Sequence, residues 1–180
     1  MRLLASWALS SVAAVFATAT VFVAAAQAAE PLASPHWRIF RTDGISVRYP
    51  PGWHATARRL TGVISPPMRF AIASYPLRQQ GPGSTCTPSR ALAEMPPSGA
   101  FIYAIEYTGT RLHRRDFPSR PKRFRLTRFA NYECMGPSYA ILFRDADRFF
   151  QIHVYIGKQA GPTVRGTVLR ILHSFRAKTI

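Results

Sequence analysis

The stretch 101–107 constrains the fold of this chain more than any other part of its sequence. Its residues form two alternating rows, with Phe101, Tyr103, Ile105 and Tyr107 in one row and Ile102, Ala104 and Glu106 in the other. This two-residue period is that of a β-strand, and both rows are mostly apolar. A strand with two apolar faces is typical of the middle of a sheet that is covered on both sides. We therefore predict that 101–107 is a central strand.

Further strands are predicted by the same alternation and by the Gly and Pro residues that separate them. They span residues 44–49, 60–64, 69–75, 124–129, 132–134, 138–144 and 148–156. The last two flank the Asp-Ala-Asp turn at 145–147, which predicts a tight antiparallel hairpin. The Pro-Pro-Gly turn at 50–52 ends the first strand, and we expect Trp53 to fold back onto the sheet as an aromatic anchor.

Two helices are predicted, and the longer one lies at the C-terminal end. Residues 162–175 carry an apolar stripe at helical spacing, made of Val164, Val168, Ile171, Leu172 and Phe175. Such a stripe predicts an amphipathic helix that packs on the sheet. A short helix is predicted at 88–95, before Pro96 and Pro97. The predicted fold class is α+β, an antiparallel β-sheet packed against a C-terminal amphipathic helix, with a short middle helix.

The first 28 residues have the pattern of an export signal. Arg2 precedes an uncharged apolar run, and Ala26-Gln27-Ala28 places small residues where a signal peptidase reads them. We predict a signal peptide at 1–28, a flexible leader at 29–37 and a single domain at 38–176, so that the mature protein is secreted or extracytoplasmic. The alternative is a domain tethered to the membrane by an uncleaved N-terminal helix, because the run reaches about 20 residues.

Both cysteines of the chain, Cys86 and Cys134, belong to the part that is predicted to be exported. In an oxidising compartment an even number of cysteines is typical of structural disulfides. We therefore predict a disulfide bond between Cys86 and Cys134.

The formal net charge of the full chain is +16, carried by 21 Arg and 3 Lys against 8 acidic residues. A coding sequence rich in G and C is one source of so many Arg residues, but the resulting field attracts anionic polymers whatever its origin. Outside the cytoplasm these are envelope glycopolymers, anionic lipid headgroups or nucleic acid. The sequence has no Gly-rich phosphate loop and no nucleic-acid-binding signature, so we predict no specific nucleic-acid partner.

The densest group of basic residues lies between positions 111 and 128. It consists of Arg111, Arg114, Arg115, Arg120, Lys122, Arg123, Arg125 and Arg128, with His113, Phe117, Phe124 and Phe129 among them. Arg binds phosphate and sulfate oxygens through paired hydrogen bonds, and aromatic faces stack on bases or sugars. We predict an anion-binding patch if these side chains share a face. The alternative is a solvated loop and an edge strand whose charges prevent aggregation.

The sequence contains no recognisable catalytic or metal-binding motif. The histidines at 36, 54, 113, 153 and 173 lack the spacing that brings two imidazoles onto one metal. Asp145 and Asp147 are expected to be turn residues instead of calcium ligands. No Ser lies in a nucleophile elbow, and Glu106 and Glu133 are expected to pair with Arg in the interior. We predict no metal and no cofactor.

Two motifs give the chain a family resemblance. Tyr49-Pro50-Pro51-Gly52-Trp53 follows the first strand, and Ile171-Leu172-His173-Ser174-Phe175 closes the last helix. With the order of the predicted elements, they make residues 38–176 resemble the PsbP-like superfamily, and the chain also resembles small exported proteins of high-GC bacteria. PsbP-like proteins share an antiparallel sheet covered by helices and generally act as binding or assembly modules.

The resemblance implies an exported, non-enzymatic binding or assembly module. Together with the basic charge, it leads us to expect an anionic polymer, an anionic membrane surface or a protein as the partner. The alternative is a cell-envelope enzyme whose cleft is assembled from residues that are distant in the sequence. A concave pocket with convergent His and acidic side chains would distinguish the enzyme from the binding module.

Overall fold

The computed structural model describes residues 36–78, 87–109, 114–127, 129–132 and 135–179 of the chain. These residues belong to one compact unit, Pro35–Ile180. The predicted signal peptide, most of the predicted leader, and both Cys86 and Cys134 lie outside the described residues. Export and the disulfide bond therefore stay predictions.

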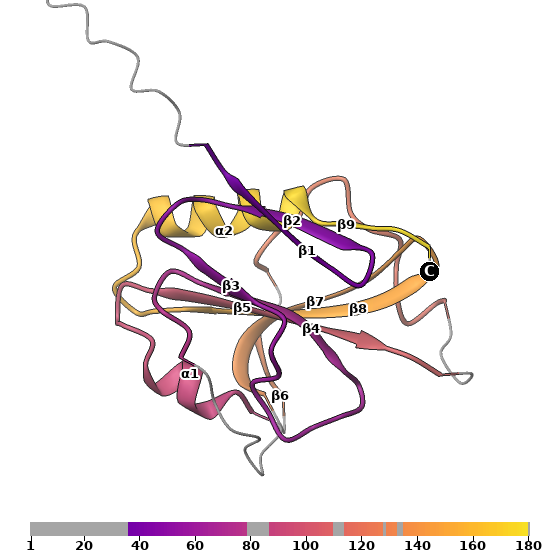
Figure 1. Ribbon diagram of the computed structural model, residues 1–180, viewed down its shortest axis with the longest axis horizontal. Coiled ribbons are helices and arrows are strands. Elements are labelled where there is room, and N and C mark those ends of the chain that lie inside the picture. Colours follow the sequence, from indigo (N-terminus) through magenta and orange to yellow (C-terminus); the bar gives the residue numbers. More distant parts are fainter. Residues whose placement is uncertain (1–35, 79–86, 110–113, 128, 133–134, 180) are drawn as a thin grey trace, which may run out of the picture. The chain divides into compact units, whose positions relative to one another are not determined.

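A six-stranded antiparallel sheet forms the centre of the domain (Figure 1). In spatial order its strands are β3 (His54–Thr56), β4 (Met68–Ala73), β5 (Ala100–Tyr107), β8 (Arg148–Ile156), β7 (Gly136–Asp145) and β6 (Phe129–Tyr132). β5 lies between β4 and β8 and pairs with both. All of its residues except Tyr107 are buried. The prediction of a central strand covered on both faces is confirmed.

The predicted hairpin is formed by β7 and β8. Asp145 pairs with Arg148 across the turn, and the two residues between them, Ala146 and Asp147, have φ angles of 51° and 58°. Positive φ at both central positions gives a turn whose twist matches that of the strands it joins. The Asp145 carboxylate accepts a hydrogen bond of 3.0 Å from the Ala177 N–H, so this residue acts as a structural turn residue.

A second, three-stranded sheet has the order β1 (Arg38–Thr42), β2 (Ile45–Tyr49) and β9 (Arg176–Ala177). β2 matches the predicted strand at 44–49, whereas β1 and β9 were not predicted. Asp43 and Gly44 join β1 to β2 with φ angles of 43° and 72°, and Asp-Gly is a favoured sequence for such a turn. Trp37, assigned to the leader in the sequence analysis, is half-buried and packs against the main core.

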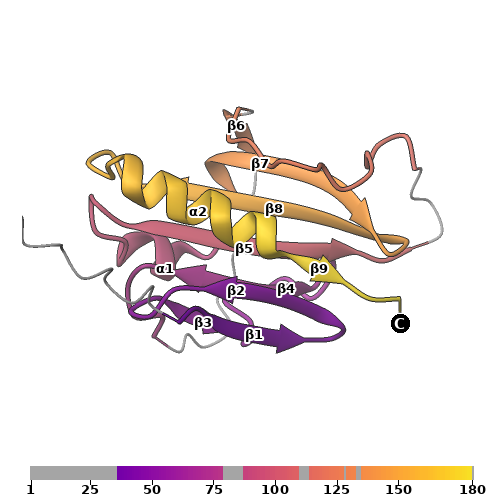
Figure 2. The ribbon, with the colours of Figure 1, turned by 90° about the horizontal axis from the view of Figure 1, so that it is seen from above.

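The helices α1 (Ser89–Ala93) and α2 (Pro162–Ser174) lie on opposite sides of the six-stranded sheet (Figure 1). They correspond to the predicted helices at 88–95 and 162–175. Figure 2 shows α2 running across β5 and β8, with β1 and β2 beside it. Pro162 occupies the first turn of α2, where its missing N–H leaves no hydrogen bond unmade. Within the described part of the chain, neither helix has the length and apolar character needed to cross a bilayer.

The side of the sheet that faces α2, which we call the closed face, is made of phenylalanine and aliphatic side chains. The Phe175 ring lies 6.0 Å from Phe70, 5.3 Å from Phe143 and 5.0 Å from Phe150, measured between ring centroids. All four rings are buried. α2 adds Val168, Ile171 and Leu172 to the same cluster. None of these side chains has a polar atom, so the closed face is packed without any need for hydrogen bonds.

The opposite side, which we call the open face, carries a second cluster that is richer in tyrosine. α1 contributes Ala91 to this cluster, and the segment between β3 and β4 contributes Leu60. The Tyr155 hydroxyl donates to the Met135 carbonyl oxygen at 2.7 Å. Every tyrosine placed on this face brings a hydroxyl that needs such a partner when it is buried.

A buried ion cluster lies at one end of the sheet. The Arg148 guanidinium donates two hydrogen bonds of 2.7 Å to the Glu106 carboxylate, and Arg69 donates a third of 2.6 Å. Burial raises the pKa of Glu106, but the hydrogen bonds and charges of Arg148 and Arg69 outweigh this effect, and the net pKa is lowered. Arg148 also donates to the carbonyl oxygens of Asp43 and Lys178. The expected pairing of Glu106 with Arg is confirmed, and it ties the two sheets together.

The strand predicted at 60–64 is wrong. These residues form a loop, and the strand of this region is β3, His54–Thr56. Leu60 is buried within the loop, so its apolar pattern reflects burial against the open face and not strand pairing. Pro66 and Pro67 follow, and neither can donate a backbone hydrogen bond to a sheet.

The strand predicted at 124–129 is also wrong over most of its length, because residues 124–127 form no strand and β6 begins at Phe129. Phe124 is buried in the main core, which explains an apolar signal without a strand. Among residues 114–121, Phe117 is buried and anchors a segment that is otherwise mostly exposed. Of the strand predicted at 132–134, Tyr132 is the last residue of β6, and Glu133 and Cys134 lie outside the described residues.

Candidate functional site

Two of the basic residues predicted to bind anions are engaged in contacts within the domain. Arg120 donates a hydrogen bond of 2.8 Å to the His173 carbonyl oxygen, and its guanidinium carbon lies 5.2 Å from the centre of the Phe124 ring. Arg114 forms an exposed ion pair of 2.8 Å with Asp147. Arg120 therefore holds its loop against the end of α2, and the charge of Arg114 is partly balanced.

The remaining basic residues of this predicted patch are more exposed. Arg115 lies 3.9 Å from the Asp116 carboxylate. Lys122, Arg123 and Arg125 are exposed and form no ion pair with another described residue. Arg111, His113 and Arg128 lie outside the described residues. The exposed cations are thus available to solvent, and their joint anion binding stays a prediction.

The aromatic residues of the predicted patch do not form a stacking surface with these cations. Phe117 is 5% exposed and Phe124 is 3% exposed, since both are packed in the interior. Only Phe129 is open to solvent, with 61% of its surface exposed. Of the three rings, it alone is accessible for stacking on a base or a sugar.

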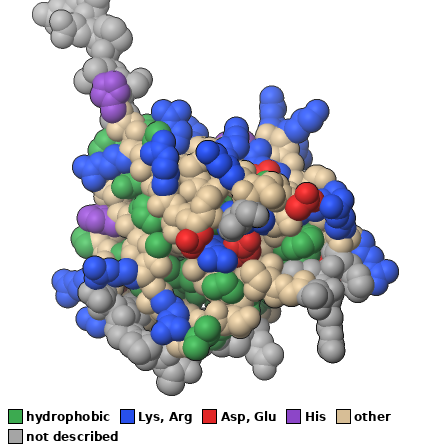
Figure 3. Space-filling model, turned by 45° about the vertical axis from the view of Figure 1, so that its right-hand side comes forward, with side chains coloured by type: hydrophobic (Ala, Val, Ile, Leu, Met, Phe, Trp, Pro, Cys, Tyr) green, Lys and Arg blue, Asp and Glu red, His purple; other side chains and the backbone are tan. Residues whose placement is uncertain are grey.

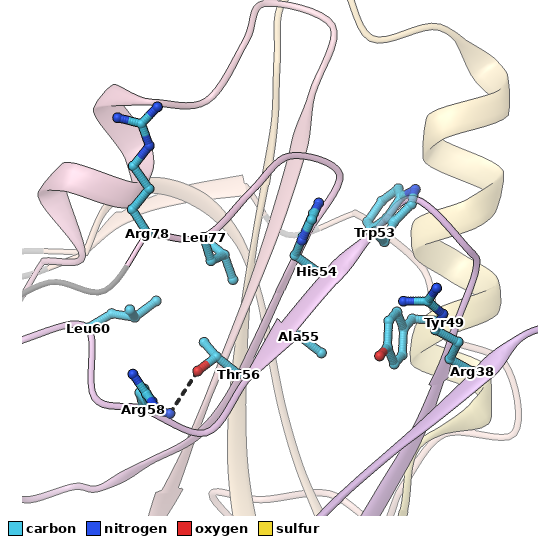
Figure 4. A pocket seen from close by; sticks show the side chains of 10 residues that line it. All are labelled: Arg38, Tyr49, Trp53, His54, Ala55, Thr56, Arg58, Leu60, Leu77 and Arg78. Atoms are coloured by element: carbon cyan, nitrogen blue, oxygen red, sulfur yellow. Dashed lines mark hydrogen bonds between the residues drawn. The ribbon is translucent and has the colours of Figure 1, made fainter.

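A cavity of about 430 Å³ at β3, an edge strand of the six-stranded sheet, brings together a different set of basic residues. We call it the basic pocket (Figure 4). It is lined by Arg38, Tyr49, Trp53, His54, Ala55, Thr56, Arg58, Leu60, Leu77 and Arg78. These residues come from both sheets, from the turn before β3, and from the segments that follow β3 and β4.

The turn between β2 and β3 forms the aromatic side of the basic pocket. Gly52 has a φ angle of 81°, in the left-handed region that favours glycine. The Trp53 N–H donates to the Pro50 carbonyl oxygen at 3.3 Å, which closes the turn. Trp53 and Tyr49 both pack against the main core, and Figure 4 shows their rings on the same side of the pocket. The predicted anchoring role of Trp53 is confirmed.

Three arginines from separate segments surround this pocket. Arg38 begins β1, Arg58 follows β3, and Arg78 follows β4. Figure 4 shows Arg38 beside Tyr49, with Arg58 and Arg78 on the other side. The lining residues include no Asp or Glu, and the side chains of Arg38 and Arg78 form no ion pair within the described parts of the chain. Because like charges repel, an anion that enters the pocket lowers the electrostatic energy of this arrangement.

The chemistry of the basic pocket suits an anionic group attached to a ring. Each guanidinium presents N–H donors in a planar fork that matches phosphate or sulfate oxygens. Ala55, Leu60 and Leu77 provide apolar surface between the cations, and the two aromatic rings suit the face of a sugar. His54 is the single histidine among the lining residues, and no lining carboxylate stands beside it to form an acid–base pair.

The structure describes the histidines at 36, 54, 153 and 173. Among the described residues, no group of three or more His, Cys, Asp or Glu side chains is arranged to hold a metal ion. His153 is buried in β8, where its Nδ1 lies 2.9 Å from the Ser138 Oγ, and burial lowers its pKa to about 4. The His173 Nε2 accepts a hydrogen bond of 3.1 Å from the Phe124 N–H. Both have structural partners.

The basic pocket could not be predicted from the sequence. Arg38, Arg58 and Arg78 are each twenty residues apart, and each lies in a segment with an ordinary charge density. Their convergence depends on the pairing of β1 with β2 and of β3 with β4. The nearest signal in the sequence is the turn at 50–52, because it fixes Trp53 beside Tyr49.

The surface charge alone does not locate a site. Figure 3 shows Lys and Arg side chains scattered across the face that it draws, with fewer acidic side chains, some near the middle and others toward the upper right. A basic surface of this kind attracts anions without selecting a position for them. A concave pocket that combines cations with aromatic rings does select a position, which favours the basic pocket over the exposed loop.

No protein-family model, curated protein or solved structure matches this chain. The resemblance to the PsbP-like superfamily therefore rests on the two sequence motifs.

Proposed function

We propose that this protein is an exported, non-enzymatic binding module that holds an anionic saccharide of the cell envelope in the basic pocket. The observation that carries this proposal is the convergence of Arg38, Arg58 and Arg78 around the rings of Tyr49 and Trp53. A volume of about 430 Å³ falls within the range of small-ligand sites. One charged sugar of a polymer would occupy the pocket, and the rest of the polymer would follow the basic surface.

Affinity in this proposal comes from two sources. Phosphate or sulfate groups accept charge-assisted hydrogen bonds from the guanidinium groups, which are stronger than hydrogen bonds between neutral groups. The face of the sugar packs on Trp53 or Tyr49, which adds apolar contact and a preferred orientation. A neutral saccharide would lose the first source, and a simple inorganic anion would lose the second.

The proposal also gives a role to the C-terminal helix. We propose that α2 is an amphipathic helix whose apolar stripe packs on the closed face. This half of the domain is then the rigid support for β1, β2 and β3. The PsbP-like resemblance supports a binding or assembly role through its two motifs, one of which contains the turn beside the basic pocket. A protein partner with a phosphorylated or sulfated surface group is the related alternative.

Calorimetric titration of the purified protein with dextran sulfate, over a series of salt concentrations, tests the proposal. Uncharged dextran serves as the ligand control. In the variant Arg38→Gln/Arg78→Gln, we expect affinity to fall by roughly tenfold or more, since two charge-assisted contacts are lost. The slope of log K against log salt should decrease by about 2, one for each lost contact.

The matched control is Arg123→Gln/Arg125→Gln, which removes the same charge from two exposed positions of the loop. We expect this variant to keep most of the affinity of the original protein. An equal loss in both variants would mean that net charge alone governs binding. A loss confined to the loop variant would move the site to the patch predicted from the sequence.

A further inference from the structure

The open face contains a second cavity, and its chemistry differs from that of the basic pocket. Its volume is also about 430 Å³. β5 and β8 form the floor, the segment 63–66 forms one wall, and Tyr132 and Met135 form the other. We call it the tyrosine pocket, because Tyr103, Tyr107 and Tyr132 line it together with Gln151 and His153.

No charged side chain belongs to the described lining of the tyrosine pocket. Val63, Ile105 and Met135 add apolar surface to the aromatic rings. Moving an ion from water into such a site carries a large desolvation cost, and the described lining holds no charge that would offset it. The tyrosine pocket therefore favours an uncharged ligand, in contrast to the basic pocket.

The Tyr132 hydroxyl oxygen and the His153 Nε2 are buried polar atoms at this pocket. Neither has a hydrogen-bond partner among the described residues. His153 is 0% exposed, and Ser138 fixes its ring by a contact of 2.9 Å at the other nitrogen. The Tyr132 ring meets the His153 ring edge-on at a centroid distance of 5.2 Å, so the two residues with unpaired atoms are neighbours in the pocket lining. Unpaired polar groups are costly and rare in protein interiors, which points to a missing partner.

Gln151 supplies a further unused donor. Its side-chain oxygen accepts a hydrogen bond of 2.6 Å from the Tyr107 hydroxyl. That contact orients the side chain, and its NH₂ group has no hydrogen-bond partner within the described part of the chain. A pocket with mostly apolar walls and a few oriented polar groups is the usual form of a small-molecule site.

From this combination we infer that the tyrosine pocket binds a small, uncharged aromatic compound that carries a hydroxyl group. The ring of the ligand lies against the tyrosine rings, which favour edge-to-face contacts. Its hydroxyl gives the Tyr132 hydroxyl and the His153 Nε2 the partner they lack. Burial keeps His153 neutral by lowering its pKa to about 4, so this imidazole stays uncharged at neutral pH. This site is independent of the basic pocket and of the function proposed for it.

A nuclear magnetic resonance titration of the full chain, labelled with ¹⁵N, tests the inference with three probes of similar size. 4-Methylphenol should bind saturably and shift the side-chain amide signals of Gln151. Toluene lacks the hydroxyl, and 4-methylbenzoate carries a charge. We expect each of these two to bind roughly tenfold more weakly, because a hydrogen bond is lost in one case and an ion is buried in the other.

Two tyrosine variants separate ligand binding from structural support. Tyr132→Phe removes a hydroxyl that has no partner among the described residues, so the thermal midpoint should not fall, whereas affinity for 4-methylphenol should drop by roughly tenfold. Tyr155→Phe removes a hydroxyl that donates to the Met135 carbonyl oxygen, so the midpoint should fall. Tyr155 does not belong to the described lining, and its variant should keep its affinity. Val63→Phe places a larger side chain in the wall and reduces the space in the pocket, so it should also weaken the binding of 4-methylphenol.

Three results would overturn the inference. The first is the absence of saturable binding of 4-methylphenol, and the second is equal binding of all three probes. The third is unchanged affinity in both Tyr132→Phe and Val63→Phe. Loss of 4-methylphenol binding in a protein that still binds dextran sulfate through the basic pocket would concern the tyrosine pocket alone.

Discussion

On the face of the six-stranded sheet that α2 covers, Phe143 and Phe150 are fully buried beside Phe175, whereas on the opposite face Tyr107 and Tyr132 border a cavity. The same strands supply both faces, because successive side chains of a strand point to opposite sides. The two sets of rings differ in one phenolic oxygen. A phenyl ring can be enclosed without partners, but each tyrosine hydroxyl must find one. One face is therefore sealed, and the other keeps room for a ligand.

The largest effect that would test this comparison comes from two neighbouring residues of β8. Phe150 is fully buried on the closed face, whereas Phe149 is half-buried on the open face, where its ring lies 5.2 Å from that of Phe117. Phe150→Ala should lower the free energy of unfolding by about 3–5 kcal/mol, as a cavity opens in a tightly packed core. Phe149→Ala should cost less than about half as much. Urea unfolding followed by circular dichroism measures both, and equal costs would show that the two faces are equally well packed.

A smaller effect concerns the open face and depends on pH. His153 has a folded-state pKa of about 4, below its ordinary value of 6.5, because burial disfavours the charged ring. Between these values the unfolded chain binds the proton more readily than the folded protein, so stability falls as the pH falls. The expected loss between pH 7 and pH 4 is about 2–3 kcal/mol. Urea unfolding over this pH range measures it.

The control for this pH dependence is His153→Asn, which should remove most of the slope between pH 6.5 and pH 4. Glu106 also titrates in acid, but in a lower range. Burial raises the pKa of Glu106, but Arg148 and Arg69 lower this pKa by more than burial raises it, so the net pKa is below the ordinary value. Its contribution to stability is present above about pH 4.3 and is lost only as the pH falls below that value. A slope that is the same in both proteins would show that His153 is not held neutral by burial.

The comparison between the faces also explains which parts of the fold could be predicted from the sequence. β5, the β7–β8 hairpin and α2 have long local patterns, so alternation, a turn signal and helical spacing were sufficient to find them. β3 and β9 are short, and β9 has only two residues, Arg176–Ala177, whereas β1, Arg38–Thr42, has no two-residue alternation of apolar side chains. Such strands form because a partner strand is already in place, and a local pattern carries no information about that partner.

The same limit applies to the pockets. The segment 111–128 was predicted to bind anions because its cations are adjacent in the sequence. Arg120, however, holds this segment against the end of α2. The basic pocket draws its three arginines from separate segments, and the tyrosine pocket combines β5, β8 and the end of β6. Alternation showed that β5 has two apolar rows. It could not show that the row with Tyr103 faces a cavity, because that depends on what covers the sheet.

The smallest effect tests whether the stability of the closed face can be changed without altering either pocket. Gly166 lies in the exposed part of α2, and a Cβ atom added there meets no other atom within 4 Å. Gly166→Ala should therefore raise the free energy of unfolding by about 0.5–1 kcal/mol, because alanine loses less conformational entropy in a helix. Gly157→Ala is the contrasting substitution, since its Cβ atom would lie 2.0 Å from the Pro97 carbonyl oxygen and force the backbone to move. Thermal unfolding gives the stability of both variants.

Affinities of Gly166→Ala for dextran sulfate and 4-methylphenol should equal those of the original protein, because α2 lines neither pocket in the described part of the chain. A change in either affinity would mean that the closed face is coupled to the ligand sites and is more than their support.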